Sequence, residues 1–228
     1  MLGGAGLGVL ACGAACGLQT KGPILWEGAS DGGLSDSAVQ VVLINGQSTV
    51  RVGGEGGNPY TDTCPAGQVV IGYRGDVLAP DSGLIVVVSR IQTLCGAIVL
   101  DETAPDPVSV TPGFLLPERG TYAGPSWSES CAANDVVVGF SGRSGQYVDR
   151  LAFQCGHWIV SNEDGGPVLT MNATTSLPAV GGDGGSPFPL AACPTGQMAI
   201  GSALRAGFWL DAFSLQCGTP SLESDAGP

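Results

Sequence analysis

The chain has 228 residues, of which 43% are hydrophobic, 38 are glycine and 16 are proline. That apolar content suffices for a core and excludes a wholly disordered chain, whereas so much glycine and proline interrupts helices and favours an all-β domain with many turns. The net charge of −12 repels phosphate backbones and argues against a nucleic-acid partner.

The N-terminal residues 1–17 predict export. Their apolar run is too short to span a membrane, and Val9-Leu10-Ala11-Cys12 resembles a bacterial lipobox, in which a signal peptidase cuts before the cysteine and a lipid is attached to it. No Lys or Arg precedes Lys21, so ordinary secretion and a fortuitous apolar terminus stay open as alternatives. We expect an extracellular or cell-envelope protein whose only membrane contact is a lipid on Cys12.

The rest of the chain divides into a tether, a domain and a tail. Residues 18–38 are rich in Gly, Ser and Asp without periodicity, which is typical of a flexible tether. Residues 39–219 are expected to form one β domain, and residues 220–228 a frayed tail.

That domain repeats one motif three times, with copies at about 39–100, 101–160 and 161–219. Each copy holds a cysteine pair, and the two members of a pair are separated by 31, 24 and 24 positions. The repeat cysteines lack the C-x-x-C spacing of a zinc site, so one disulfide within each copy is the simplest connectivity, and it implies an oxidising compartment. The predicted pairs are Cys64 with Cys95, Cys131 with Cys155 and Cys193 with Cys217.

The front half of each copy ends in a glycine-rich loop and an aromatic residue. Val-Gly-Gly-acid-Gly-Gly occurs twice, at Gly53–Gly57 before Tyr60 and at Gly181–Gly185 before Phe188, and Trp127 is the counterpart in the second copy. Because all three copies keep the aromatic residue, we expect it to anchor the core or an interface. The glycine loops are either tight turns or segments that bring backbone close to a ligand.

The back half of each copy predicts two strands. Runs such as Val136–Phe140 are β-branched and aromatic and end in glycine-rich turns, and the following runs, such as Trp209–Cys217, alternate only partially, which indicates a bulge after the aspartate. One unit of this size with exposed edges is marginal, but three together bury their inner faces. The repeats therefore predict a triangular prism of sheets around a pseudo-threefold axis.

Between these strands, two copies carry Gly-x-x-x-Asp, ending at Asp149 and Asp211. A carboxylate on a glycine-hinged loop beside an aromatic ring suits sugar hydroxyls, but an aspartate here also caps turns or accepts nearby N–H groups. Tyr147 and Trp209 either stack on a sugar or pack in the core, which is the commoner fate of strand aromatics. The first copy has Ser89 at the aspartate position, so we expect its sheet to bind nothing.

These residues resemble two known families. Residues 136–151, VVVGFSGRSGQYVDRL, are similar to the closing segment of jacalin-related lectins, V-G-F-x-G-[RT]-[ST]-G-x-x-x-D-x-[IL]. The threefold arrangement with bracketing disulfides, which the lectins lack, is similar to that of the vitelline membrane outer layer protein family. Both resemblances imply a β-prism of three Greek-key sheets.

The lectin resemblance also implies a sugar site. In that family, the aspartate of the Gly-x-x-x-Asp loop accepts hydrogen bonds from two sugar hydroxyls, loop backbone N–H groups donate to sugar oxygens, and a neighbouring glycine-rich loop supplies another N–H. The carried-over positions are Gly145, Gln146, Tyr147, Val148 and Asp149, and Gly207, Phe208, Trp209, Leu210 and Asp211. Which glycine loop faces which aspartate stays open.

Enzymatic and cofactor sites find little support in the chain. His157 has no equivalent in the other copies and no obvious Ser or Cys partner, and the G-x-S-x-G match at Gly28–Gly32 lies in the tether, away from a strand-to-helix turn. Neither a calcium loop nor a phosphate loop is present. We predict no catalytic residue, no metal and no cofactor. The sequon at Asn172 matters only in a eukaryotic host.

The sequence thus predicts an exported, lectin-like protein that is not an enzyme and whose partners are glycans or polysaccharides. The alternative is a structural envelope or coat protein with the same fold and no specific ligand, which the cysteine density and the degenerate first copy favour.

Overall fold

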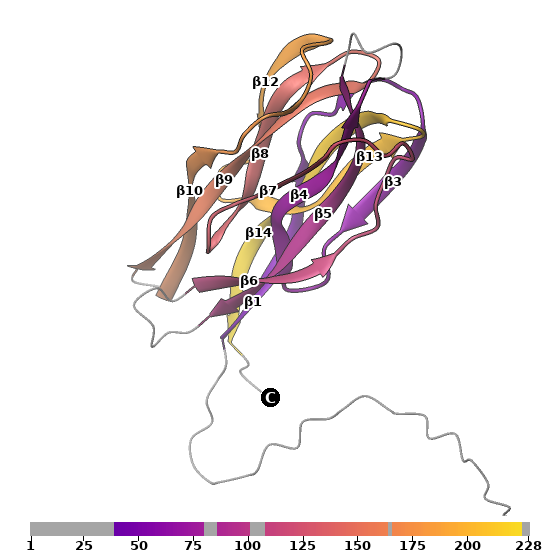
Figure 1. The fold of residues 1–228 in the computed structure, drawn as a ribbon. Coiled ribbons are helices and arrows are strands. Elements are labelled where there is room, and N and C mark those ends of the chain that lie inside the picture. Colours follow the sequence, from indigo (N-terminus) through magenta and orange to yellow (C-terminus); the bar gives the residue numbers. More distant parts are fainter. Residues whose placement is uncertain (1–38, 80–85, 101–107, 164–165, 225–228) are drawn as a thin grey trace, which may run out of the picture. The chain divides into compact units, whose positions relative to one another are not determined.

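The computed structural model describes residues 39–79, 86–100, 108–163 and 166–224 (Figure 1). The predicted signal at 1–17 with Cys12, the tether at 18–38 and residues 225–228 lie outside the described residues. Within the described ranges the regular structure is entirely β, and no helix there is long and apolar enough to cross a membrane.

The strands form three antiparallel sheets. Sheet A has the order β1 (Val39–Ser48), β14 (Leu210–Ser224), β13 (Met198–Ala206) and β3 (Asn58–Thr63), with β2 (Val52–Gly53) on β14. Sheet B has the order β6 (Val108–Leu115), β5 (Val87–Leu100), β4 (Gln68–Leu78) and β7 (Ser126–Ser130). Sheet C has the order β10 (Gly166–Ser176), β9 (Val148–Glu163), β8 (Asp135–Ser144) and β12 (Ser186–Ala192), with β11 (Val180–Gly181) on β9.

Each sheet is a Greek key that is offset by half a repeat from the sequence copies. In sheets B and C, the hairpin from the back half of one copy pairs with the front half of the next copy. The last strand of each sheet in chain order, β7 or β12, therefore returns to lie beside the first, β4 or β8. In sheet A, the hairpin of the third copy pairs with the front half of the first, which joins the two ends of the domain. Residues 220–224, assigned to the tail from sequence, pair with β1 because they complete this sheet.

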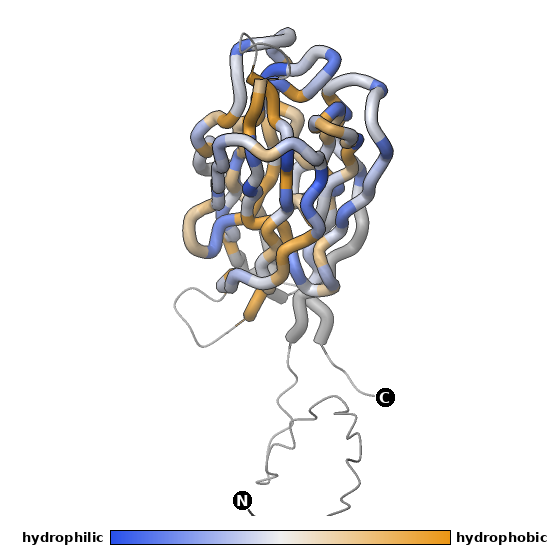
Figure 2. Tube along the Cα trace, turned by 45° about the vertical axis from the view of Figure 1, so that its right-hand side comes forward, coloured by the Kyte–Doolittle hydropathy of each residue, from blue (hydrophilic) through white to orange (hydrophobic). Residues whose placement is uncertain are grey.

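The three sheets enclose a main hydrophobic core cluster and a second, smaller one to which all three sheets also contribute, which confirms the predicted β-prism. The central strands β4, β8 and β13 each contact the other two. Between them, Tyr73 of sheet B stacks on Phe153 of sheet C with ring centroids 4.3 Å apart, and Phe213 of sheet A meets Tyr73 edge-on at 5.5 Å and Phe140 at 4.9 Å. All four rings are fully buried. Hydrophobic stretches lie along the inner strands, and the outer loops are mostly polar (Figure 2).

The recurring aromatic residues are anchors of this core, as predicted. Tyr60, Trp127 and Phe188 are partly buried and pack against the main cluster. Phe188 lies 5.7 Å from Phe140, and the guanidinium of Arg119 lies 4.2 Å above the ring of Tyr60.

The predicted disulfides are confirmed, and each joins two sheets. The pairs are Cys64–Cys95, Cys131–Cys155 and Cys193–Cys217. The first cysteine follows the last strand of one sheet, where its amide donates to the neighbouring strand of that sheet, as from Cys131 to Ile71 at 2.9 Å. The second cysteine lies in β5, β9 or β14 of the next sheet. Because sheets and copies are offset by half a repeat, a disulfide within a copy connects neighbouring sheets.

Removing one of these links should destabilise the domain strongly. We expect Cys131→Ala with Cys155→Ala to lower the free energy of unfolding by about 3–4 kcal/mol, because the unfolded chain loses a closed loop. Urea denaturation of both proteins under oxidising conditions measures the difference. Cys193→Ala with Cys217→Ala removes a disulfide that closes a loop of equal sequence separation, 24, and serves as the matched comparison. A loss below about 1 kcal/mol in both variants would contradict a stabilising role for these links.

Candidate functional site

Both predicted aspartates occupy β-bulges. In sheet C, Arg143 pairs with Arg150 and Ser144 with Val148, which leaves Asp149 as the extra residue of β9. In sheet A, the same shift leaves Asp211 between Leu210 and Ala212. The bulge expected after the aspartate is therefore at the aspartate itself. Bulges re-aim side chains, and here each one turns a carboxylate toward the adjoining glycine loop.

The structure decides which glycine loop faces which aspartate. The amide of Gly54 donates to the backbone oxygen of Asp211 at 2.8 Å, and the amide of Gly182 donates to that of Asp149 at 2.8 Å. The preceding residues, Gly53 and Gly181, have φ of 99° and 104°, and a Cβ on either would clash with the same backbone oxygen. Only glycine permits this approach.

Site A is therefore Gly207–Asp211 with Gly53–Gly57, and site C is Gly145–Asp149 with Gly181–Gly185. Both carboxylates are nearly covered, since Asp149 is 5% and Asp211 6% exposed. In site A, both carboxylate oxygens of Asp211 lie against Gly56 and Gly57, and one accepts a hydrogen bond from the Gly207 amide at 3.1 Å. In site C, a carboxylate oxygen of Asp149 lies against Gly185.

The electrostatics of the two carboxylates are also alike. Burial raises the pKa of Asp149 and of Asp211 above the ordinary value. The positive charge of Arg143 and the Gly145 amide partly offset this rise in the pKa of Asp149, and the Gly207 amide and Arg205 do the same for the pKa of Asp211.

Two arginines that sequence reasoning missed hold the glycine loops. Arg205 donates from Nε and Nη2 to the carbonyl oxygens of Gly56 and Gly57, at 2.7 and 2.8 Å. Arg143 donates in the same way to Gly184 and Gly185, both at 2.8 Å. A signal was present, because each arginine stands two residues before the glycine of Gly-x-x-x-Asp, in the same two copies that keep the aspartate.

The ten predicted site residues include some that are buried and some that are exposed. Val148 and Leu210 are fully buried in the core, so only their backbone faces the loops. Gly145 and Gln146 are exposed, and Phe208 is 60% exposed. The two loops share one turn, in which the glycine amide donates to the oxygen two residues on, from Gly145 to Tyr147 and from Gly207 to Trp209.

Tyr147 and Trp209 do not follow the commoner fate of strand aromatics. Among the described residues, the two core clusters do not include either ring. Both are half-buried at the loops, with centroids 6.2 Å apart. The alternative that these rings pack in the core is therefore wrong, because both residues lie in the hairpin turns that precede β9 and β14 and not in a strand.

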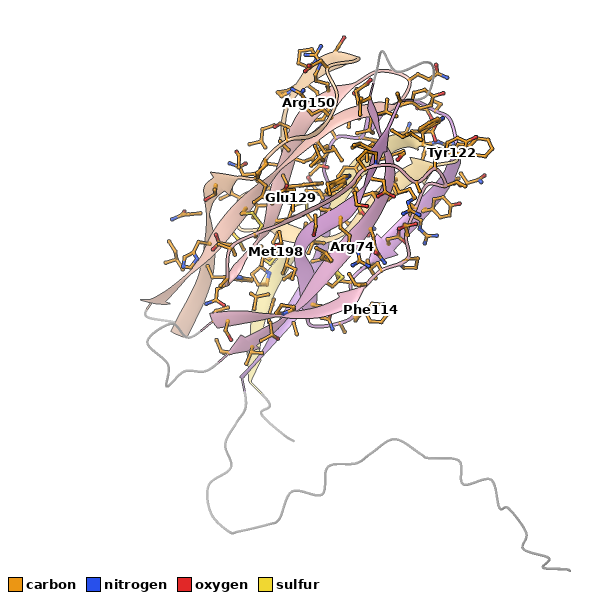
Figure 3. All side chains as sticks on the ribbon, viewed as in Figure 1. Arg74, Phe114, Tyr122, Glu129, Arg150 and Met198 are labelled. Atoms are coloured by element: carbon orange, nitrogen blue, oxygen red, sulfur yellow. A yellow bond between two sulfur atoms is a disulfide. The ribbon has the colours of Figure 1, made fainter. Side chains whose placement is uncertain are left out.

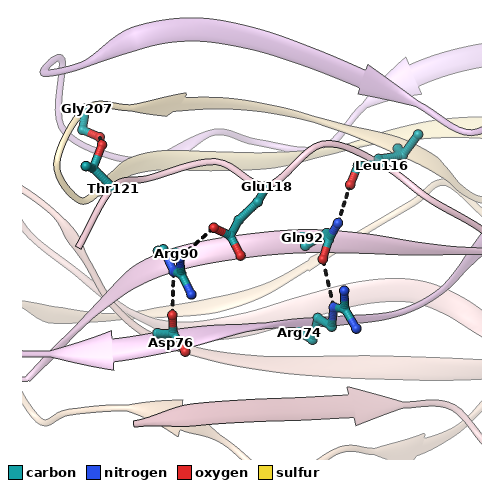
Figure 4. Close-up of polar contacts among 8 residues, drawn as sticks. All are labelled: Arg74, Asp76, Arg90, Gln92, Leu116, Glu118, Thr121 and Gly207. Carbon is teal, nitrogen blue, oxygen red and sulfur yellow. Dashed lines mark hydrogen bonds and ion pairs between the residues drawn. The ribbon is translucent and has the colours of Figure 1, made fainter. Parts of the chain in front are cut away.

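Sheet B carries the same backbone with different chemistry. Ser89 is the bulge residue, is fully buried, and faces Gly120, whose φ is 92°. Asp76 replaces the loop-holding arginine and forms an ion pair with Arg90, which also contacts Glu118 at 2.8 Å (Figure 4). Sheet B thus has a partly exposed ion-pair network of Asp76, Arg90 and Glu118, and no bulge carboxylate.

The described residues also bear on the predictions for a metal site and for the single histidine. In the part of the chain that the structure describes, no three His, Cys, Asp or Glu side chains are grouped to hold a metal ion. His157 of β9 contacts Asp135 of β8 at 2.7 Å and pairs with it across the hairpin.

Comparisons with known proteins return solved structures only. No protein-family model and no curated protein matches the chain. A mannose-binding lectin from Champedak is 14% identical, with 80% of this chain and 98% of that chain covered and a TM-score of 0.47. A mannose-specific jacalin-related lectin from Morus nigra, solved with mannose, is 15% identical, with coverages of 82% and 99% and a TM-score of 0.46. Malaysian banana lectin is 15% identical, with coverages of 77% and 99% and a TM-score of 0.46. At these values the β-prism assignment rests on the sheets themselves, and the resemblance to the outer layer proteins stays a prediction.

The close approach of glycine to the bulge predicts a position-specific effect of alanine. Gly67→Ala should lower the free energy of unfolding by about 1–2 kcal/mol, which is the cost of alanine in a left-handed backbone conformation. The φ of Gly67 is 73°, but nothing lies within 4 Å of its Cβ position. Gly181→Ala should lower the free energy of unfolding more, by about 3 kcal/mol or above, since the new methyl group must also displace the Asp149 carbonyl. Urea denaturation of the two variants compares them. Equal losses of stability in the two variants would show that the backbone of Gly181 does not approach the Asp149 carbonyl closely.

The raised pKa values predict that the aspartates lower stability at neutral pH. A carboxyl whose pKa is raised in the folded state favours folding less as the pH rises from the ordinary aspartate value, about 3.9, through the raised value. We expect Asp149→Asn with Asp211→Asn to unfold at a higher temperature than the parent at pH 7, and the difference to shrink on acidification toward pH 4. Thermal unfolding across this range measures it. A variant less stable by a constant amount at every pH would show that the carboxylates stabilise the fold through hydrogen bonds.

Proposed function

We propose that the protein is an exported carbohydrate-binding protein, a lectin-like β-prism that recognises sugar hydroxyls through sites A and C and catalyses no reaction. One observation carries the proposal. The bulge aspartate, the facing glycine loop and the arginine that holds this loop occur together twice, and sheet B keeps the bulge while replacing the aspartate with Ser89 and the arginine with Asp76. The fold therefore does not require the carboxylates, although they are costly to bury.

The arrangement suits a neutral polyol. A carboxylate accepts hydrogen bonds from two neighbouring hydroxyls, and charge-assisted bonds of this kind are the stronger ones. Glycine lets the loop backbone approach the carboxylate closely, and backbone N–H groups of the loops can donate to sugar oxygens. Each site alone should bind weakly, because the hydroxyls exchange bonds with water for bonds with protein.

The three disulfides support an oxidising, extracellular setting. Lipidation at Cys12 and secretion by the segment 1–17 remain part of the proposal and lie outside the described residues.

A structural coat protein without a ligand is the second candidate. It is favoured by the hydrogen bond from the Gly207 amide to Asp211, which shows the carboxylate serving a local role in the loop.

Glycan binding separates the two candidates. We expect the oxidised, soluble protein to bind a subset of glycans on an array, with a free monosaccharide competing. Asp149→Asn with Asp211→Asn should reduce this binding at least tenfold, because the acceptor charge is lost while the shape is kept. Glu129→Gln in β7 of sheet B removes one charge elsewhere and should leave binding unchanged (Figure 3). A blank array from the folded protein, or undiminished binding by the double variant, would favour the coat protein.

A further inference from the structure

Sites A and C touch each other. The glycine loop of site A lies against the Gly-x-x-x-Asp loop of site C, where a Cβ on Gly54 would clash with the backbone oxygen of Gln146. The hairpin turns after β8 and β13 lie at one end of the domain, opposite the end where β14 finishes (Figure 1). The two carboxylate sites therefore share one continuous surface.

A row of aromatic rings lies on this surface and brings together loops and turns from all three sheets, with Tyr122 in the loop between β6 and β7 of sheet B. Tyr147 of site C lies 6.2 Å from Trp209 of site A, Trp209 lies 4.8 Å from Tyr122 of sheet B, and Tyr122 stacks on Phe208 at 5.0 Å. We call these four residues the aromatic ridge. Tyr122 is 41% and Phe208 60% exposed. Exposed rings in contact form an apolar surface that water covers poorly.

Sheet B holds its part of the ridge in place. The amides of Thr121 and Tyr122 both lie 3.3 Å from the backbone oxygen of Phe208, and the Thr121 hydroxyl donates to the oxygen of Gly207 at 3.2 Å (Figure 4). Sheet B lacks a bulge carboxylate, but its loop places Tyr122 beside the site A loop. Preorganised rings need little further ordering when a ligand binds.

We propose that sites A and C are the two ends of one extended site, which takes a single neutral oligosaccharide chain across the aromatic ridge instead of two separate sugars. The inference rests on the proposed function. The carboxylates accept hydroxyls at the two sites, and the ridge, which begins at Tyr147 of site C and continues through Trp209 of site A, covers apolar faces of the sugar rings. A neutral chain fits because the protein carries a net charge of −12 and both sites are built on carboxylates, which repel acidic glycans.

Calorimetric stoichiometry tests this. The full protein is titrated first with the monosaccharide that competes best on the array, and then with linear oligomers of that sugar of increasing length. We expect two monosaccharides per protein, but one oligomer per protein once the chain reaches both carboxylates, with at least tenfold higher affinity. Asp149→Asn or Asp211→Asn alone should each abolish the gain with length while leaving one monosaccharide site.

Tyr122→Ala tests the ridge separately from the carboxylates. It should lower the affinity for the long oligomer about tenfold and leave two monosaccharides per protein, since both carboxylates and both glycine loops are unchanged. Phe114→Ala removes a ring that is 55% exposed in β6, far along the domain from Tyr122, and should change neither value (Figure 3). Two long oligomers per protein without a gain in affinity would overturn the extended site and leave the proposed function standing. Failure of every monosaccharide and oligomer to bind would overturn the proposed function itself.

Discussion

The packing of aromatic rings from three sheets is the interaction on which the rest of the domain depends. Tyr73, Phe140, Phe153 and Phe213 meet where the central strands face one another, and none of these rings is exposed. A sheet of four or five strands cannot bury its own inner face, so each sheet needs the other two. Once the central strands converge, their hairpin turns come together at one end. The contact between sites A and C is a consequence of closing the prism.

The links between sheets follow from the half-repeat offset. A front half and a back half that are continuous in sequence belong to different sheets, so the disulfide and the chain itself both cross the boundary. Arg119 adds another link, since it donates two hydrogen bonds to Asp62 of sheet A at 2.9 and 2.6 Å. Pairing of β1 with β14 joins the ends of the domain. The neighbouring sheets are therefore joined by disulfides and by an ion pair as well as by the core, and the ends of the domain by strand pairing.

The three bulges separate what the fold needs from what the sites add. Every sheet has a bulge and a glycine of positive φ facing it, at Gly53, Gly120 and Gly181, so this backbone is structural. The nearly covered carboxylates of Asp149 and Asp211 are an addition, and burial makes their ionised form unfavourable. Residues that break a local rule without helping the fold are expected at functional sites. Sheet B has Ser89 at its bulge and an ion pair of Asp76 and Arg90 beside it.

The sequence by itself determined the local features: the β class, the three copies, the cysteine pairs and the bulge position near each aspartate. These depend on residue types and spacings within one copy, such as the glycine and aspartate of Gly145–Asp149. Only the tertiary structure decided that Gly53–Gly57 faces Asp211, that Arg143 and Arg205 hold glycine loops, and that Tyr147 and Trp209 meet outside the core. Each of these contacts joins segments from different copies. Spacing along one copy carries no information about which copy lies opposite, because that is set by how three sheets close around a shared core.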